Sequence, residues 1–476
     1  MLRRRALLLS TLSFSALLVC VLVSPASAIS TRSFVLDDLT MLAAGELTHV
    51  AAFSDGHVET SLDLRRIALP DDVAFAWSAV RAPDGTIYLG TGDTGRIYRI
   101  SGDAVTLFAE TGQLLVSALA LGEGGVLYAG TLPEGRVYAV DTTGATAGTA
   151  RELVRPADAD GTHAAEHVWA LAYDSARHVL FAGTGPEGRV YAIDRSGSAS
   201  VYWDSTAEHV MSLALEGGAL YAGTSDDAIV VRLTAPGSAE VVDDFPGNEI
   251  TALAIRDGRL VVGANEFPDP PAVASSSATT KRTATTASPA RPRPGKARVY
   301  TVEAGGRAER AWGQDEGHVT RLEIASDGTI YAATGHDGRI VRIATDRTSA
   351  VWVDVDERQV LAIGLTEPDP YFVTSDGAAL YRAVPGRPRT ASWTSKVLDA
   401  EFDARWGALE WRGTGTLRFS TRSGGTARPD ESWSDWSTET TTPGPNRSPA
   451  GRFLQQRASF DGDPEAVLRA VTAYYL

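Results

Sequence analysis

The chain has 476 residues, of which 44 are basic and 59 acidic, and its net charge is −15 at pH 7. This acidic balance argues against nucleic acid and anionic membranes as partners, because both need a basic surface. It is compatible with cations, sugars, cationic ligands and protein partners, and it selects none of them. The length is sufficient for two full hydrophobic cores.

Residues 1–28 have the pattern of a signal peptide. Three arginines at positions 3–5 precede an apolar stretch at 6–23, and small residues at 26–28 form a cleavage site. Cleavage there would remove the only cysteine, Cys20, and lower the 44 basic residues by three. The apolar stretch is also long enough to stay as an uncleaved anchor. We expect an exported protein, periplasmic or extracellular, with no integral membrane segment after cleavage.

One phrase recurs seven times after this segment. Copies such as IYLGTGDTGRIYRI (87–100) and LFAGTGPEGRVYAI (180–193) contain a glycine-threonine pair and a glycine-arginine pair. Four of the six intervals between copies are 40 residues, and the other two, 53 and 70 residues, are the same unit with insertions. A repeat of this length, made of short strands and glycine turns, predicts one four-stranded sheet per copy. Seven copies predict a seven-bladed β-propeller.

Three further segments belong to this predicted propeller, which we place at residues 31–388. Residues 46–64 have a strand-like pattern, and we expect them to supply the strand that closes the ring on the last repeat. Residues 266–297, rich in Pro, Ala, Ser and Thr, interrupt the fifth repeat between its second and third strands and predict a disordered loop extension. A second insertion, at 142–166, leads into the third repeat.

The repeat stops near residue 386, and the composition changes. Five of the ten tryptophans lie in residues 393–476, and the strand-like runs there predict a smaller, jelly-roll-like β-sandwich at 389–476. The predicted fold class is therefore all-β, with a propeller followed by a sandwich. Trp433 and Trp436 fit a pattern in which tryptophans interleave with arginines of a neighbouring strand, for which the candidates are Arg418, Arg422 and Arg457. Stacking of exposed tryptophans on sugar rings is the alternative.

The repeat, written DG-(T/R)-(I/L)-Y-x-G-T…G-R-(I/V)-Y, resembles the propeller repeats of bacterial two-component-regulator sensor domains and of streptogramin-lyase-like proteins. The resemblance covers roughly residues 76–383. It implies the fold and leaves the activity open, because propellers host many unrelated functions. The tail, with its segments 406–411 and 448–455, is similar to a module of unknown function at the ends of secreted bacterial propeller proteins.

Residues that recur in every unit are expected to be structural, since the fold needs them seven times. This applies to the glycine-threonine and glycine-arginine pairs and to the tyrosines that follow them. The repeated arginines at 96, 136, 189 and 339 are predicted to pack or to pair with carboxylates of the adjacent turns, namely Asp93, Glu134, Glu187 and Asp337.

Residues that break the repeat are better candidates for function. Several units have His or Glu just before their first strand: Glu166, His167, Glu208, His209, Glu249 and His318. In a propeller these junctions converge at the mouth of the central channel, where imidazole and carboxylate groups suit a divalent metal or an acid–base site. Streptogramin lyases use His and Glu on such a face with a divalent cation, but their motif does not match residue by residue. The structural alternative is that these histidines cap strands or pair with neighbouring carboxylates.

Other ligand-binding candidates lie on the insertion before the third repeat, at equivalent junctions and in the tail: Asp158, Asp160, His163, Trp77, Gln359, Trp433 and Trp436. The sequence has no nucleophile elbow, phosphate loop or dinucleotide fingerprint. Three hypotheses follow. The first is an exported, non-catalytic binding protein with an unknown protein or small ligand. The second is a metal-assisted lyase or hydrolase, with a divalent metal as its cofactor. The third is a carbohydrate-associated protein that binds through the sandwich.

Overall fold

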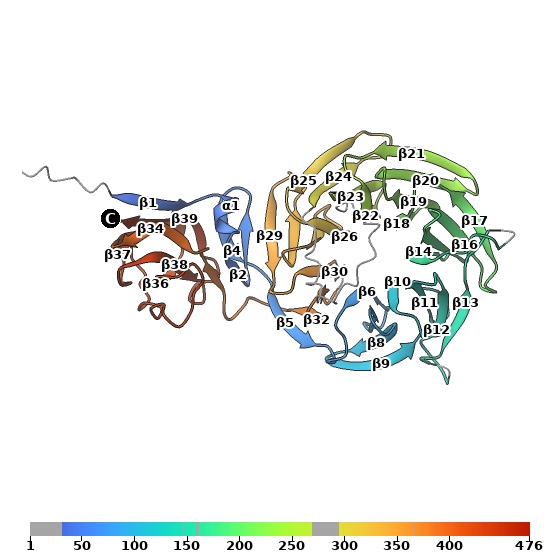
Figure 1. Ribbon diagram of the computed structural model, residues 1–476, viewed down its shortest axis with the longest axis horizontal. Coiled ribbons are helices and arrows are strands. Elements are labelled where there is room, and N and C mark those ends of the chain that lie inside the picture. Colours follow the sequence, from blue (N-terminus) through green and yellow to red (C-terminus); the bar gives the residue numbers. More distant parts are fainter. Residues whose placement is uncertain (1–30, 146, 159–160, 269–294, 367) are drawn as a thin grey trace, which may run out of the picture.

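The computed structural model describes residues 31–476 except 146, 159–160, 269–294 and 367. Its strands form a ring of seven sheets around a central axis and a β-sandwich at one side of the ring (Figure 1). The predicted fold class, a seven-bladed β-propeller followed by a smaller β-sandwich, is confirmed. No helix within the described ranges is long and apolar enough to cross a membrane. The predicted signal peptide, 1–28, lies outside the described residues.

The first three blades each contain four antiparallel strands, which follow chain order from the channel to the rim of the ring (Figure 1). Blade 1 consists of β6 (Ala76–Arg81), β7 (Ile87–Thr91), β8 (Arg96–Ser101) and β9 (Ala104–Glu110). Blade 2 consists of β10 (Leu115–Leu121), β11 (Val126–Leu132), β12 (Val137–Asp141) and β13 (Ala150–Val154). Blade 3 consists of β14 (His167–Asp174), β15 (Val179–Gly185), β16 (Arg189–Ile193) and β17 (Ala199–Asp204).

The next three blades repeat this arrangement. Blade 4 consists of β18 (Val210–Glu216), β19 (Ala219–Thr224), β20 (Ile229–Ala235) and β21 (Ser238–Asp244). Blade 5 consists of β22 (Glu249–Arg256), β23 (Arg259–Glu266), β24 (Lys296–Val302) and β25 (Ala308–Gln314). Blade 6 consists of β26 (His318–Ile324), β27 (Ile330–Gly335), β28 (Arg339–Ile343) and β29 (Ser349–Asp354). The insertion predicted at 266–297 falls between β23 and β24, although Glu266 and Lys296 are still paired with each other.

The seventh blade is closed by a strand from the N-terminal part of the chain. It consists of β30 (Gln359–Gly364), β31 (Tyr371–Ser375), β32 (Ala379–Val384) and β5 (Asp63–Ala68). Strand β5 is antiparallel to β32 along six residue pairs, so the rim strand of the last blade precedes the first blade in sequence. We expected residues 46–64 to do this, but only 63–64 of that range belong to the closing strand.

The β-sandwich combines strands from both ends of the chain. One sheet contains β37 (Gly444–Pro445), β35 (Trp406–Thr414), β39 (Val467–Tyr475), β1 (Arg32–Leu36), β4 (His57–Thr60) and β3 (Val50–Phe53). The other contains β2 (Glu46–Thr48), β33 (Ser392–Thr394), β38 (Gly451–Ser459), β34 (Leu398–Ala404) and β36 (Arg418–Gly424). A short helix, α1 (Leu39–Leu42), lies between β1 and β2. We expected residues 31–388 to form the propeller, but β1, β2 and β4, within residues 32–60, pair with strands of the sandwich.

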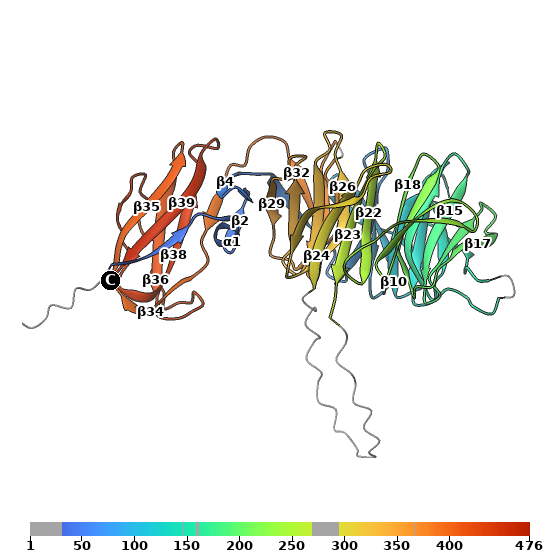
Figure 2. The same ribbon diagram turned by 90° about the horizontal axis from the view of Figure 1, so that it is seen from above.

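The hairpin β3–β4 joins the sandwich to the propeller. Strand β3 pairs with β29, the rim strand of blade 6, and β4 pairs with β39 of the sandwich. Figure 2 shows the sandwich next to β29 and β32, with this hairpin between the two parts. The core of the sandwich includes the fully buried side chains of Trp393, Phe419 and Phe460.

The glycine of the repeated glycine-threonine pair is needed for a close contact between blades. A Cβ added to Gly90 would lie 2.6 Å from Cγ1 of Val116, and one added to Gly263 would lie 2.8 Å from Cγ1 of Val319. In both cases the neighbour is a β-branched residue on the innermost strand of the next blade. The same relation holds for Gly130 and Gly223, so this glycine allows the next blade to pack directly on the backbone.

The threonine of the pair stabilises the hairpin that follows it. Its hydroxyl donates to the carbonyl five residues on, as from Thr91 to Arg96 (3.0 Å) and from Thr334 to Arg339 (3.0 Å). The repeated arginines pair chiefly with carboxylates of the rim strand in their own blade, namely Glu110, Glu152, Asp204 and Asp354. Of the predicted turn partners, Glu134 and Asp337 also contact their arginines, whereas Asp93 and Glu187 form no ion pair within the described part of the chain.

We predict that Gly90→Ala lowers the free energy of unfolding by about 1–3 kcal/mol, because the new methyl group would overpack against Val116. Gly425→Ala is the control, since a Cβ there would meet no atom within 4 Å and Gly425 has no positive φ. We expect that variant to change stability by no more than about 0.5 kcal/mol. Chemical denaturation of the three proteins measures the difference, and equal losses in both variants would contradict the packing argument.

Candidate functional site

Each innermost strand contains one β-bulge near its first residue. The pairing with the second strand skips one residue in every blade, in order Trp77, Ser117, Trp169, Met211, Thr251, Thr320 and Leu361. A bulge bends the strand and re-aims a side chain, and bulges are common beside functional sites. Because the innermost strands surround the channel (Figure 1), the seven bulges gather around one of its mouths.

Hydroxyl groups at or next to the bulges join neighbouring blades. Ser212 Oγ donates to the carbonyl of Ile250 (2.7 Å), and Thr251 Oγ1 donates to that of Val319 (2.6 Å). Equivalent bonds are donated by Ser78, Ser117 and Thr320 to the next blade. Blades 3 and 7 have no hydroxyl at these positions, where they carry Trp169-Ala170 and Leu361-Ala362. The bulge of blade 3 is therefore not used for a link of this kind.

Three aromatic rings meet at the mouth, on blade 3 and at the start of blade 4. The ring centroids of His167 and His209 are 5.5 Å apart. The ring centroid of Trp169 lies 5.3 Å from that of His167 and 5.5 Å from that of His209. Burial lowers the pKa of His209, and His167 acts in the same direction, while Glu208 and Asp226 oppose the shift. His209 is therefore neutral at pH 7.

The same three rings have nitrogen atoms without partners. His167 Nδ1, Trp169 Nε1 and His209 Nδ1 are buried, and none has a hydrogen-bond partner among the described residues. Buried polar atoms in folded proteins are nearly always hydrogen-bonded, so each exception needs an explanation such as a bound water, ion or ligand. Three exceptions in one ring cluster, referred to below as the mouth cluster (His167, Trp169 and His209), mark it as the strongest candidate for a binding site.

The predicted carboxylates contribute less. Glu166 and Glu208 are exposed, and the carboxylate of Glu208 lies 3.9 Å from His209 Nε2. Glu249 is half-buried, and burial raises its pKa, with a further contribution from Asp226. Over the residues that the structure describes, no group of three or more His, Cys, Asp or Glu side chains could hold a metal ion. Of the predicted metal set, the structure brings together the rings of His167 and His209.

His318 belongs to a second group of rings. It lies beside Phe267, with ring centroids 5.4 Å apart, and beside His336, which the sequence analysis did not single out. Burial, with a smaller contribution from the nearby His336, lowers the pKa of His318 to about 4. His318 is therefore a neutral, buried imidazole on blade 6, apart from the contacts of the mouth cluster.

The remaining predicted residues of the mouth have local roles. Asp158 and His163 bond to each other, with Nδ1 of the histidine 2.6 Å from the carboxylate, and this contact raises the pKa of His163. Asp160 lies outside the described residues. Trp77 is 37% exposed, and Gln359 is half-buried opposite Gly335 of the neighbouring blade.

A cavity of about 170 Å³ occupies the channel. It is lined by the innermost strands of six blades, and its walls include Trp169, Met211 and Arg321. The sequence analysis missed these three residues. Strand alternation could not have found them, because the bulge shifts which residues face the channel and is seen only in the pairing of the strands.

The tryptophans of the sandwich are packed or covered by cations. Three are buried, namely Trp393, Trp406 and Trp433, and Trp411 stacks on Phe419 with ring centroids 4.2 Å apart. The ring of Trp436 has the guanidinium of Arg457 at 4.4 Å and that of Arg422 at 4.6 Å. The predicted interleaving is therefore confirmed for Arg422 and Arg457, whereas Arg418 lies near Glu439 and Asp461. We accordingly do not propose a sugar site on these rings.

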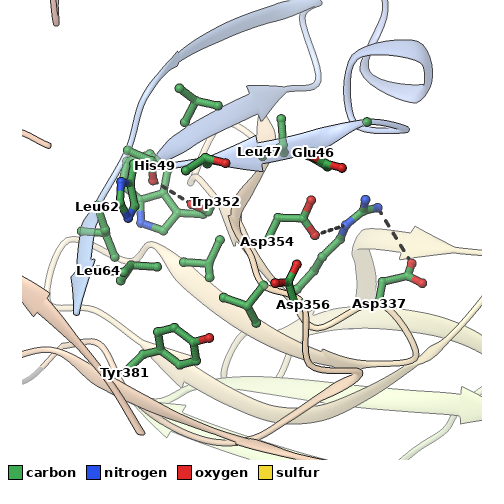
Figure 3. Close-up of a pocket in the computed structure, with 17 residues that line it drawn as sticks. Glu46, Leu47, His49, Leu62, Leu64, Asp337, Trp352, Asp354, Asp356 and Tyr381 are labelled. Carbon is green, nitrogen blue, oxygen red and sulfur yellow. Dashed lines mark hydrogen bonds and ion pairs between the residues drawn. The ribbon is translucent and has the colours of Figure 1, made fainter. Parts of the chain in front are cut away.

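A second cavity, of about 490 Å³, lies where blade 6 meets the N-terminal strands (Figure 3). Leu47, Leu62, Leu64 and Tyr381 form part of its wall. At its edge Arg339 Nε lies 3.0 Å from the carboxylate of Asp354, and Arg339 Nη2 donates to the carbonyl of Ala43 (2.7 Å). Burial raises the pKa of Asp354, and Arg339 opposes this shift. This arginine therefore ties the rim of blade 6 to the segment that continues into the sandwich.

No protein-family model and no curated protein matches the chain. Solved structures do match. A streptogramin B lyase has a TM-score of 0.52 at 12% identity, covering 68% of this chain and 97% of that one. A catalytically inactive virginiamycin B lyase from Staphylococcus aureus, solved with quinupristin, has a TM-score of 0.52 at 10% identity, covering 68% and 99%.

A third match is the extracellular domain of a proposed hybrid two-component system from B. thetaiotaomicron. Its TM-score is 0.51 at 11% identity, and the match covers 73% of this chain and 46% of that one. At these identities the likeness shows the fold alone. The propeller scaffold is therefore shared with a lyase and with extracellular regulator domains, which are the two groups that the repeat resembles.

We predict that Arg339→Met lowers the free energy of unfolding by about 2 kcal/mol, because it leaves Asp354, whose side chain is 14% exposed, without its partner. The double variant with Asp354→Asn should recover part of this loss. Arg358→Met is the control, since its ion pair with Asp376 is exposed and is worth at most about 1 kcal/mol. Thermal or chemical unfolding would refute the prediction if Arg339→Met were no more destabilising than Arg358→Met.

We predict that the protein loses stability as the pH falls from about 6.5 to about 4, in part because of His318. Its pKa in the folded state is about 4, below the ordinary value, so in this window the unfolded chain binds the proton and the folded chain does not. The contribution is about 3 kcal/mol at most. His318→Gln should flatten this part of the pH profile, and a profile as steep as that of the wild type would contradict the prediction.

Proposed function

We propose that this chain is an exported, non-catalytic binding protein that holds its ligand at the mouth of the propeller channel. The observation that carries the proposal is the mouth cluster, with its three ring nitrogens that lack partners. Aromatic faces with a few polar atoms are typical of small-molecule sites. The ligand would have a flat or apolar face and at least one hydrogen-bonding group. Trp77, which is exposed, lies at the equivalent bulge of blade 1, two blades away.

Two features of the sequence support the export part of this proposal. Residues 1–28 carry the charged, apolar and small-residue regions of a signal peptide. The chain that remains after cleavage would contain no cysteine, so its fold would not depend on the redox state of the compartment that it enters.

A metal-assisted lyase or hydrolase is the second candidate. The observation that favours it is the pair of imidazoles in the mouth cluster, His167 and His209, whose Nδ1 atoms are both free of protein partners. A divalent ion would need a further ligand beyond these two, and the carboxylates that act on His209 are Glu208, 3.9 Å from its Nε2, and Asp226. Elemental analysis of the purified protein separates the candidates. A divalent metal that is lost on chelation and in His209→Ala would favour the lyase or hydrolase.

The binding proposal is tested with 2-naphthol, a planar probe with one hydroxyl group, by equilibrium dialysis. We expect the wild-type protein to bind it, and Trp169→Ala and His209→Ala to weaken binding at least about tenfold, or ~1.4 kcal/mol each. Phe402→Ala is the control, because Phe402 is an exposed aromatic residue of the sandwich. Equal affinities in all four proteins, or no binding to any, would refute a site at the mouth cluster.

A further inference from the structure

We propose that the central channel contains an anion site centred on Arg321, which binds a carboxylate or another small oxyanion. The inference deepens the proposed function, because it assigns a negatively charged group to the ligand. For the rest of the ligand it rests on the proposed function. The anion site itself is defined by the channel cavity and the surroundings of Arg321, and it can be tested without the complete ligand.

The first observation is the position of Arg321 in the ring. It directly follows the bulge of blade 6, and the other six blades carry a small residue at the equivalent position: Ser78, Ala118, Ala170, Ser212, Ala252 and Ala362. Small side chains are expected where seven strands converge on one axis. A long, charged side chain at one of the seven positions is not required by the fold, and it places a guanidinium against the cavity.

The second observation is that this guanidinium has no countercharge. Arg321 Nη1 donates to the carbonyl of Thr320 (2.8 Å), and Arg321 forms no ion pair with any part of the chain that the structure describes. Burial lowers its pKa, and no carboxylate offsets that shift. Arginine nevertheless stays protonated in proteins. Arg321 is half-buried, and a partly desolvated charge without a countercharge gains from an anion, so an anion at this place would stabilise the folded protein.

The cavity itself suits a small anion. Of the described residues that line it, Arg321 alone is charged, and polar atoms make up most of the accessible wall. Such a wall can offer hydrogen-bonding groups beside the guanidinium. A volume of about 170 Å³ admits an anion of a few heavy atoms and little more.

Trp169 connects this cavity with the mouth cluster. Its side chain belongs to the mouth cluster, and the same residue lines the channel cavity together with Arg321. A ligand with its flat part on the rings would therefore direct a negatively charged end towards the guanidinium. A planar aromatic carboxylate has this combination of groups. A free inorganic oxyanion could use the same guanidinium, and the experiment below separates the two sources.

The test compares sodium acetate with inorganic phosphate, at equal sodium concentration, on the wild-type protein, Arg321→Met and Arg321→Lys. For the wild type we expect acetate to raise Tm by about 2–4 °C once its concentration is well above Kd. Arg321→Met keeps an unbranched, flexible side chain and removes its charge, and should weaken acetate binding at least tenfold. Arg321→Lys, which keeps the charge, should retain part of it. Arg358→Met, on the surface, should match the wild type.

The outcomes separate this inference from the proposed function. Stabilisation by acetate that depends on Arg321 supports a carboxylate site, and stabilisation by phosphate alone assigns the site to an inorganic oxyanion. Equal effects on the wild type and Arg321→Met, or no effect on either, would overturn the anion site even if 2-naphthol binds at the mouth. Binding of acetate without binding of 2-naphthol would leave the anion site standing and remove the mouth cluster. If both sites stand, 2-naphthoate should bind the wild type at least tenfold more tightly than 2-naphthol, and Arg321→Met should abolish this preference.

Discussion

The close approach of each blade to the next is the constraint on which the ring depends. A β-branched side chain of one innermost strand, such as Val116, rests on the backbone of the preceding blade at a glycine, here Gly90. The hydroxyl bond from Ser78 to the carbonyl of Val116 lies at the same contact. These contacts are short and repeat around the ring, so the residues that make them are held constant from copy to copy.

The side chain at the bulge itself varies from blade to blade, whereas the position directly after it is small in six of the seven blades. Blades 1, 2, 4, 5 and 6 use a hydroxyl group there as an inter-blade link, each worth about 1 kcal/mol net. Blade 3 gives up this link and carries Trp169, which joins the mouth cluster. Blade 6 keeps the link through Thr320 and adds Arg321 at the next position. The two candidate binding groups thus lie where blade 3 and blade 6 depart from the pattern of the other blades.

The repeat predicted the number of blades, the order of their strands and the place of the long insertion, because all three follow from local periodicity. It could not assign residues 32–60, since their strand-like alternation is the same whichever sheet they join, and their partners in β33 and β39 lie more than 300 residues away. At the site, His167 and His209 stood out because they break the repeat. Trp169 and Arg321 did not, because a bulge shifts which residues of a strand face the channel, and the sequence carries no mark of it.

Arginines near the rim have carboxylate partners, whereas Arg321 in the channel has none among the described residues. The composition of the chain does not explain this difference. Acidic residues outnumber basic ones by 59 to 44, so partners for a guanidinium are abundant in this chain. Arg136 pairs with two carboxylates, and Arg339 does the same where the propeller meets the N-terminal strands. Arg321 is surrounded instead by the small and apolar residues that the converging strands require. The channel itself therefore leaves Arg321 without a carboxylate partner among the described residues. An anionic ligand that enters from the mouth could supply the negative charge.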